Sequence, residues 1–193
     1  MGLDVLLETA QSGSGNAARA ALSDLVSRLY PSLIGYLVNL TSDRETAKDA
    51  CQETMVRIVT SISKFAPRPG TGLMASLRAW AFAIATNVCR DLSRKSPRTR
   101  PLADVGEDLE SDRTRQAPAT EDEALSGIAR DSLMSAVDRL PREQRGVFLL
   151  KAYYGYSYRE IGRIVGCPEG TAKSRLHHAV LALREEMKRR GTQ

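Results

Sequence analysis

The sequence predicts an all-α protein with two small helical domains joined by a flexible acidic linker. Strand signals are nearly absent, because β-branched residues nowhere alternate with polar residues over a useful length. Hydrophobic residues instead recur with a period of about 3.6 residues at both ends of the chain, and the stretch between them lacks this period. These patterns place one helical domain at residues 1–100, the linker at 101–124 and the second domain at 125–193.

The composition is that of a soluble globular protein. Of the 193 residues, 42% are hydrophobic and 26% are charged, which excludes wholesale disorder. The longest apolar stretches, such as residues 79–85, are far shorter than the roughly 20 residues that a membrane-spanning helix needs. The N-terminus carries acidic residues where a secretory signal carries basic ones. We therefore expect a cytoplasmic protein without a membrane span.

Cysteine and histidine are too few and too scattered to suggest a metal site. Cys51, Cys89 and Cys167 lie far apart in the sequence, and the two histidines are neighbours at 177 and 178. The chain also has no glycine-rich phosphate loop and no nucleophile–base constellation. We expect reduced, buried thiols and a protein that is not an enzyme and has no metal and no cofactor.

Charge is divided unevenly along the chain. Residues 1–100 carry 13 basic and 8 acidic side chains, residues 101–124 carry 2 and 8, and residues 125–193 carry 13 and 7. The middle segment has too few apolar residues to order itself, so we interpret it as a linker. An acidic linker between basic domains is either a solvated tether or a segment that follows a basic channel of a partner while DNA repels it.

Two amphipathic helices are predicted early in the first domain. The first spans about residues 17–40, where leucines recur on one side and Pro31 predicts a kink or a break. The second spans about residues 44–62. Its predicted core positions are Cys51, Met55, Ile58, Val59 and Ile62. Its other side carries Asp49, Glu53 and Arg57 one turn apart, which suits either a docking face or an exposed face with weak i,i+4 ion pairs.

A third helix, predicted at about residues 75–95, presents an unusual face beside its apolar stripe. At 100° per residue, Trp80, Ala83, Asn87, Arg90 and Arg94 fall together. An aromatic ring, an amide and two guanidinium groups supply the stacking, hydrogen bonding and phosphate neutralisation that a single-stranded nucleic acid requires. The alternative is that Trp80 belongs to the edge of the core and the arginines are solvated.

The last third of the chain predicts a helix-turn-helix. A helix over about residues 141–154 precedes the capping box at Ser157 and Glu160, which begins a short helix that stops at Gly166. After the tight turn at residues 166–168, a longer helix covers about residues 169–188. A short helix, a turn containing glycine and a longer helix are typical of the DNA-binding motif.

The first turns of that last helix carry the predicted base-reading residues. Lys173, Ser174, His177 and His178 lie on its outward side, where helix-turn-helix proteins contact base edges in the major groove. Arg175 lies at the edge of this side and suits an ion pair or a phosphate contact as well as it suits base readout. The two histidines are also compatible with an ordinary surface.

The motifs of both domains together resemble the extracytoplasmic-function (ECF) sigma factors of bacterial RNA polymerase. The segment Asp49-Ala-Cys-Gln-Glu53 is similar to the Asp-x-x-Gln-Glu pattern of the family's region two, and Trp80, Asn87, Asp91 and Arg94 are similar to the helix that follows it. In the second domain, Leu140-Pro-Arg, Ser157-Tyr-Arg-Glu-Ile and Gly170-Thr-Ala-Lys-Ser-Arg resemble the family's region four.

The resemblance implies a role for each face. Asp49, Gln52, Glu53 and Arg57 would bind the clamp of the largest subunit of core RNA polymerase. Trp80, Asn87, Arg90 and Arg94, with the Pro/Gly loop at 65–73, would contact the −10 element of promoter DNA, and Lys173, Ser174, Arg175, His177 and His178 would contact the −35 element. The linker would thread the RNA exit path, and an anti-sigma factor is an expected partner.

A free-standing helix-turn-helix regulator is the principal alternative. Such a protein would bind a palindromic duplex without polymerase, and it would leave the face around Trp80 unexplained. A helical enzyme is a weaker alternative, since the sequence offers no constellation for catalysis.

Overall fold

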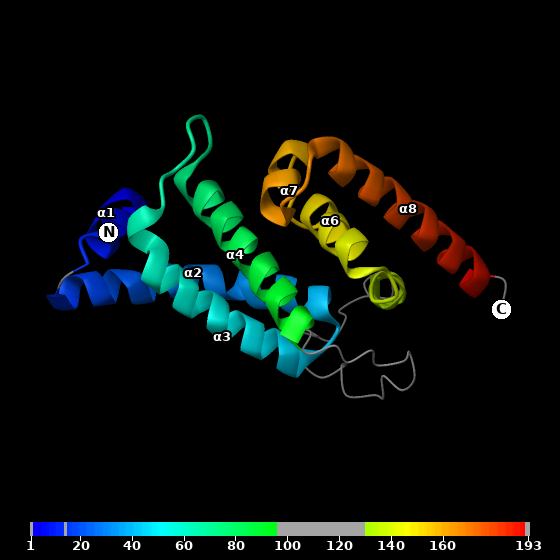
Figure 1. Cartoon of the computed structure of the whole chain (residues 1–193), viewed down its shortest axis with the longest axis horizontal. Coiled ribbons are helices and arrows are strands. Elements are labelled where there is room, and N and C mark those ends of the chain that lie inside the picture. Colours follow the sequence, from blue (N-terminus) through cyan, green and yellow to red (C-terminus); the bar gives the residue numbers. More distant parts are fainter. Residues whose placement is uncertain (1, 14, 96–129, 192–193) are drawn as a thin grey trace, which may run out of the picture.

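The computed structural model describes residues 2–13, 15–95 and 130–191, and every regular element in these ranges is helical. The all-α prediction is therefore confirmed. The N-terminal helices are α1 (Leu3–Gln11), α2 (Gly15–Thr41), α3 (Arg44–Ser61) with a short 3-10 turn at Ile62–Lys64, and α4 (Leu73–Lys95). Residues 130–137 are helical, and α6 (Arg142–Ala152), α7 (Tyr158–Val165) and α8 (Glu169–Gly191) follow (Figure 1). The predicted linker at 101–124 lies outside the described residues.

The N-terminal helices pack around α2. Leu25, Leu29, Leu33 and Leu37 recur every fourth residue along this helix and are all buried, as an amphipathic pattern requires. The helix continues through Pro31, which is exposed, so the break considered above does not occur. Helix α1, which was not predicted from the sequence, also joins this core through its buried face.

Helix α3 begins at a cap and buries a narrower face than its sequence predicts. The Asp43 carboxylate accepts a hydrogen bond from the backbone N–H of Thr46 at 3.1 Å, which satisfies one of the free donors of the first turn. Cys51 and Ile58 are buried as predicted, but Val59 is 42% exposed. Thr54 is buried instead, because its hydroxyl donates to the Ala50 carbonyl at 2.6 Å and needs no water.

The predicted helix-turn-helix is present in α7 and α8. The Ser157 and Glu160 side chains each bond the other's backbone N–H, which forms the capping box at the start of α7. Gly166 ends α7 with φ at 69°, a left-handed conformation that favours glycine. Gly162 is equally constrained, since a Cβ there would lie 2.6 Å from the Cys167 carbonyl oxygen in the turn.

The capping box predicts a pH-dependent loss of stability. Replacing Ser157 with alanine should lower the free energy of unfolding by about 1 kcal/mol, as is typical for the loss of an N-cap. Hydrogen bonds from Ser157 also lower the pKa of Glu160, so its contribution is complete above the ordinary glutamate pKa and is lost as pH falls through the lowered value. Urea unfolding of the wild type and Ser157→Ala between neutral and acidic pH measures both effects, and the difference between the two proteins should shrink at acidic pH.

The C-terminal helices pack directly on the N-terminal ones, with α6 against α2 and α7 against α4 (Figure 1). An aromatic cluster fills part of this contact. The Phe82 ring lies 4.6 Å from the Tyr154 ring and 6.0 Å from the Tyr156 ring, centroid to centroid, and 4.9 Å from Tyr36. Burial raises the pKa of Tyr154 and of Tyr156 to about 12, so both hydroxyls are neutral at physiological pH.

Polar contacts reinforce the aromatic cluster. The Tyr154 hydroxyl donates to the Ser32 carbonyl at 3.0 Å, and the Ser42 hydroxyl donates to the Asp138 carboxylate at 2.9 Å. Arg145, which is only 8% exposed, donates to the Leu40 carbonyl at the end of α2. The two helical parts therefore meet through a contact of mixed apolar and hydrogen-bonded character. None of the described helices is both long enough and apolar enough to cross a membrane.

Candidate polymerase and nucleic-acid interfaces

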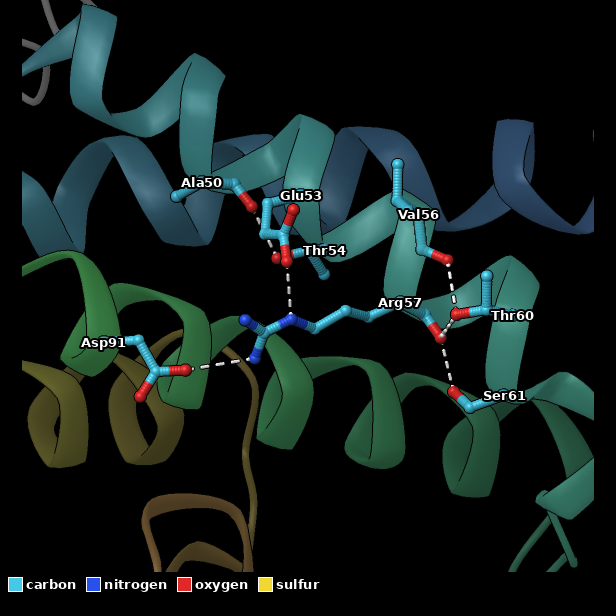
Figure 2. Close-up of polar contacts among 8 residues, drawn as sticks. All are labelled: Ala50, Glu53, Thr54, Val56, Arg57, Thr60, Ser61 and Asp91. Carbon is cyan, nitrogen blue, oxygen red and sulfur yellow. Dashed lines mark hydrogen bonds and ion pairs between the residues drawn. The ribbon is translucent and has the colours of Figure 1, made fainter.

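An ion-pair network joins α3 to α4 (Figure 2). Arg57 donates through Nε to the Glu53 carboxylate at 2.7 Å and through Nη1 to the Asp91 carboxylate at 3.1 Å. The hydrogen bonds to Glu53 and then to Asp91 raise the pKa of Arg57. Because all three side chains are 40–45% exposed, each pair is worth only about 0.2–1 kcal/mol. Glu53 and Arg57, two of the three charged residues predicted to share a face of this helix, thus have contacts within the molecule.

The outermost face of α3 lies beside this network. Asp49 and Gln52 are exposed, and Val56 and Val59, which follow Gln52 at i+4 and i+7, are 54% and 42% exposed. This outer α3 face (Asp49, Gln52, Val56 and Val59) combines a charge, an amide and two apolar side chains. Val56 was not among the residues predicted for this face, and the prediction that Val59 belongs to the core was wrong. Their spacing from Gln52 was the signal that could have found them.

The predicted −10 face of α4 is partly engaged inside the molecule. Trp80 is half-buried and packs on Phe65, with the ring centroids 5.1 Å apart. The Asn87 side-chain oxygen accepts from Arg90 at 2.9 Å, and the same guanidinium donates to the Val165 carbonyl of α7 at 2.7 Å. The contact with α7 therefore covers part of this face.

The predicted −35 residues divide into two groups on α8. Lys173, Ser174, His177 and His178 are exposed on its first turns, and the two imidazole rings lie 5.8 Å apart. Arg175 is half-buried and forms an ion pair with Glu143 of α6. The four exposed side chains are available to a partner in this structure, whereas Arg175 already has one.

Metal-binding groups do not gather at these faces. In residues 2–13, 15–95 and 130–191, no three His, Cys, Asp or Glu side chains come close enough together to hold an ion. Cys51 and Cys89 are buried, and burial raises the pKa of both thiols, while Cys167 is half-buried. Raised pKa values keep the two buried thiols protonated, which lowers their reactivity.

Family models match both helical parts of the chain. The model for sigma-70 region 2 matches residues 25–99, and the model for sigma-70 region 4 matches residues 130–183. The first match contains α3 and α4, and the second contains the helix-turn-helix. The faces described above fall within these two regions.

Whole-chain relatives carry the same family name. The ECF RNA polymerase sigma factor SigL of Mycobacterium tuberculosis is 34% identical over 173 residues, which cover 90% of this chain and 92% of SigL. The ECF RNA polymerase sigma factor EcfG of Rhodopseudomonas palustris is 31% identical over 159 residues, covering 82% of this chain and 81% of EcfG.

Solved structures show the same fold. The sigma factor RpoE of Bartonella quintana, solved in complex with the anti-sigma factor NepR, is 23% identical and superposes with a TM-score of 0.62 over 86% of this chain and 96% of that one. CnrH, solved with the cytosolic domain of CnrY, is 24% identical with a TM-score of 0.61 over 95% and 96% of the two chains. With its two matched sigma-70 regions and its whole-chain relatives, this chain belongs to the ECF RNA polymerase sigma factors, regulatory proteins that direct transcription initiation from promoters.

Proposed function

We propose that this chain binds core RNA polymerase through the outer α3 face and reads promoter DNA through α4 and α8. The exposed side chains on the first turns of α8 carry this proposal, because a recognition helix contacts base edges with this end and here it is open to solvent. The proposal assigns residues 1–100 to core and −10 binding, 101–124 to a linker and 125–193 to −35 binding.

Each face suits a different part of the task. On α3, Asp49 and Gln52 supply polar contacts to the polymerase clamp, with Glu53 and Arg57 at the flank. On α4, Trp80 and Asn87 suit stacking and hydrogen bonding to unpaired bases of the −10 element, and Arg90 and Arg94 suit its phosphates.

On α8, the side chains of Lys173, Ser174, His177 and His178 suit the −35 element. Arg175 suits a phosphate contact once it leaves Glu143. The ion pair that sets Arg175 apart from the other four supports a backbone-binding role for Arg175.

The proposal includes a protein inhibitor and excludes catalysis by this chain. The Bartonella quintana protein of the same fold was solved with an anti-sigma factor, and we propose a partner of that kind here. Promoter selection needs binding energy and no bond-making step, so polymerase supplies the chemistry.

Run-off transcription tests the proposal. Core polymerase should produce a defined transcript from the promoter of this protein's own operon only when the protein is added. A free-standing regulator would instead bind a duplex palindrome tightly without core and give no transcript. The isolated chain should bind promoter duplex DNA poorly, because the contact between α4 and α7 covers part of the −10 face and leaves the α8 face to bind without it.

The recognition helix should separate base readout from phosphate binding. Replacing Lys173 or His177 with alanine should relax specificity at particular −35 base pairs and cost about 1–3 kcal/mol against the preferred sequence. Replacing Arg175 should instead weaken all sequences evenly and make the salt dependence shallower, because one phosphate contact is lost. His178→Ala should also weaken binding to all −35 sequences by a similar factor. Selection from a randomised −35 library measures these preferences, and identical preferences for wild type and Lys173→Ala would remove Lys173 from the base-reading set.

A further inference from the structure

A cavity of about 350 Å³ lies where the N-terminal and C-terminal helices meet. Its apolar lining comes from Tyr36 and Leu40 of α2 and Val165 of α7, with the backbone of Gly146 in α6. The packing at Gly146 is tight, since a Cβ there would lie 3.2 Å from a methyl carbon of Leu40. Because α2, α4, α6, α7 and α8 all contribute lining residues, the cavity is complete only while the two helical parts are in contact.

The remaining lining is strongly basic. Arg90 and Arg94 of α4, Arg142 of α6 and Arg175 of α8 all border the cavity, and Glu143 is the single acidic residue among the described residues that line it. Glu143 pairs with Arg175. Arg90 and Arg142 bond neutral groups instead, the Val165 carbonyl and the Ser93 hydroxyl.

Such clustering of guanidinium groups favours an anion. Like charges that border one cavity repel one another, and a bound anion would relieve this repulsion. Guanidinium groups match phosphate geometry through two parallel hydrogen bonds, which a compact ammonium group does not offer. The volume falls in the range of small-molecule pockets and is too small for a folded partner.

We propose that this cavity binds an organic phosphate, a small apolar ring or chain that carries a phosphate group. The apolar body packs against Tyr36, Leu40 and Val165, and the phosphate lies among the guanidinium groups. Since both helical parts supply lining residues, the ligand stabilises their contact by mass action. The bound ligand would hold Arg90 and Arg94 away from the −10 element and so reduce transcription. This effect rests on the proposed function.

Titration calorimetry with the full chain and phenyl phosphate tests the binding. Inorganic phosphate supplies the charge without the apolar body, and benzyl alcohol supplies the ring without the charge. Phenyl phosphate should bind most tightly of the three. Arg142→Gln should bind it at least about tenfold more weakly, with Arg142→Lys between that variant and the wild type. Arg189→Gln removes the same charge from the far end of α8 and should bind as the wild type does.

Three further measurements make the outcome decisive. Phenyl phosphate should raise the Tm and lower the radius of gyration in small-angle X-ray scattering, and circular dichroism should show that Arg142→Gln stays helical. Equal affinity for phenyl phosphate and inorganic phosphate, or equal affinity of Arg142→Gln and wild type, would overturn the proposal.

The acidic segment 101–124 is the competing occupant, and a linker variant identifies it. If phenyl phosphate bound only after Asp104, Glu107 and Asp108 were changed to amides, the cavity would belong to the linker and the proposed ligand would be wrong. Failure of run-off transcription would leave the calorimetry unaffected, so this proposal and the proposed function fail independently.

Discussion

Replacing Arg145 with alanine is expected to lower the free energy of unfolding by about 3 kcal/mol or more. Its guanidinium donates to the carbonyls of Val137 at 3.1 Å, Leu140 at 3.0 Å and Leu40 at 3.2 Å. The side chain is buried, and burial lowers the pKa of Arg145. After truncation the Val137 carbonyl would keep the backbone N–H of Leu140 as a donor, but the carbonyls of Leu40 and Leu140 would lose the guanidinium, and a buried carbonyl left unpaired costs about 1–3 kcal/mol. Urea unfolding followed by circular dichroism measures the loss.

Arg139→Ala provides the matched control for Arg145→Ala. Arg139 is 58% exposed and pairs with Glu186 across the surface, so its replacement should change stability by at most about 1 kcal/mol. The bond to Leu40 also predicts that Arg145→Ala weakens the contact between α6 and α2, which would appear as faster limited proteolysis between the two helical parts. Equal losses of stability in the two variants would contradict the structural role of Arg145.

Val56→Asp is expected to weaken binding to core polymerase by about 100-fold, equivalent to about 2.7 kcal/mol. Val56 is 54% exposed on the outer α3 face, where an interface would bury it. A carboxylate at this position would lose its water on binding without gaining a partner. Competition of labelled protein for core, read by fluorescence anisotropy, measures the change.

Val5→Asp supplies the control for Val56→Asp. Val5 is 51% exposed on α1, so this variant introduces the same charge at a similarly exposed valine outside the proposed interface. It should bind core as the wild type does. If Val56→Asp also bound core normally, the outer α3 face would be wrong.

Charge reversal tests the flank of that face. Reversing Glu53 and Arg57 together should weaken core binding. Helicity should be retained because the reversed pair can still form within α3, although residue 57 would then carry a negative charge opposite Asp91. The effect should be smaller than that of Val56→Asp, since the ion pairs are exposed. If the double reversal weakened core binding and Val56→Asp did not, the docking face would lie closer to α4 than proposed.

The sequence predicted those features that local signals specify. The capping box at Ser157 and the left-handed Gly166 define the start and end of α7, and both depend on residues within one turn. The period of the leucines in α2 fixed its buried side for the same reason. Four of the five predicted side chains of α8 are exposed, as an outward face requires, while Arg175 is half-buried, and the DNA contacts of all five remain predictions.

Features that depend on distant residues could not be predicted. Tyr154 bonds the Ser32 carbonyl 122 residues earlier in the chain, and nothing near either residue signals the pairing. Helix periodicity predicts a buried position only to within about one residue, so it placed both Ile58 and Val59 in the core. The packing of α3 buries Ile58 and leaves Val59 exposed. The hydrogen bonds of Arg57 and Arg90 to neighbouring helices likewise could be found only from the three-dimensional structure.

The packing of Trp80 on Phe65 gives the molecule a built-in optical reporter. Trp80 is the single tryptophan among 193 residues, so emission excited at the red edge of the absorption band comes from this one ring and not from the six tyrosines. Its half-buried position against Phe65 makes its emission wavelength sensitive to water at the surface proposed for the −10 element. In solutions that contain this chain as the sole protein, the emission of the unmodified protein would therefore report changes at this one ring, and a stopped-flow fluorimeter would give their time course.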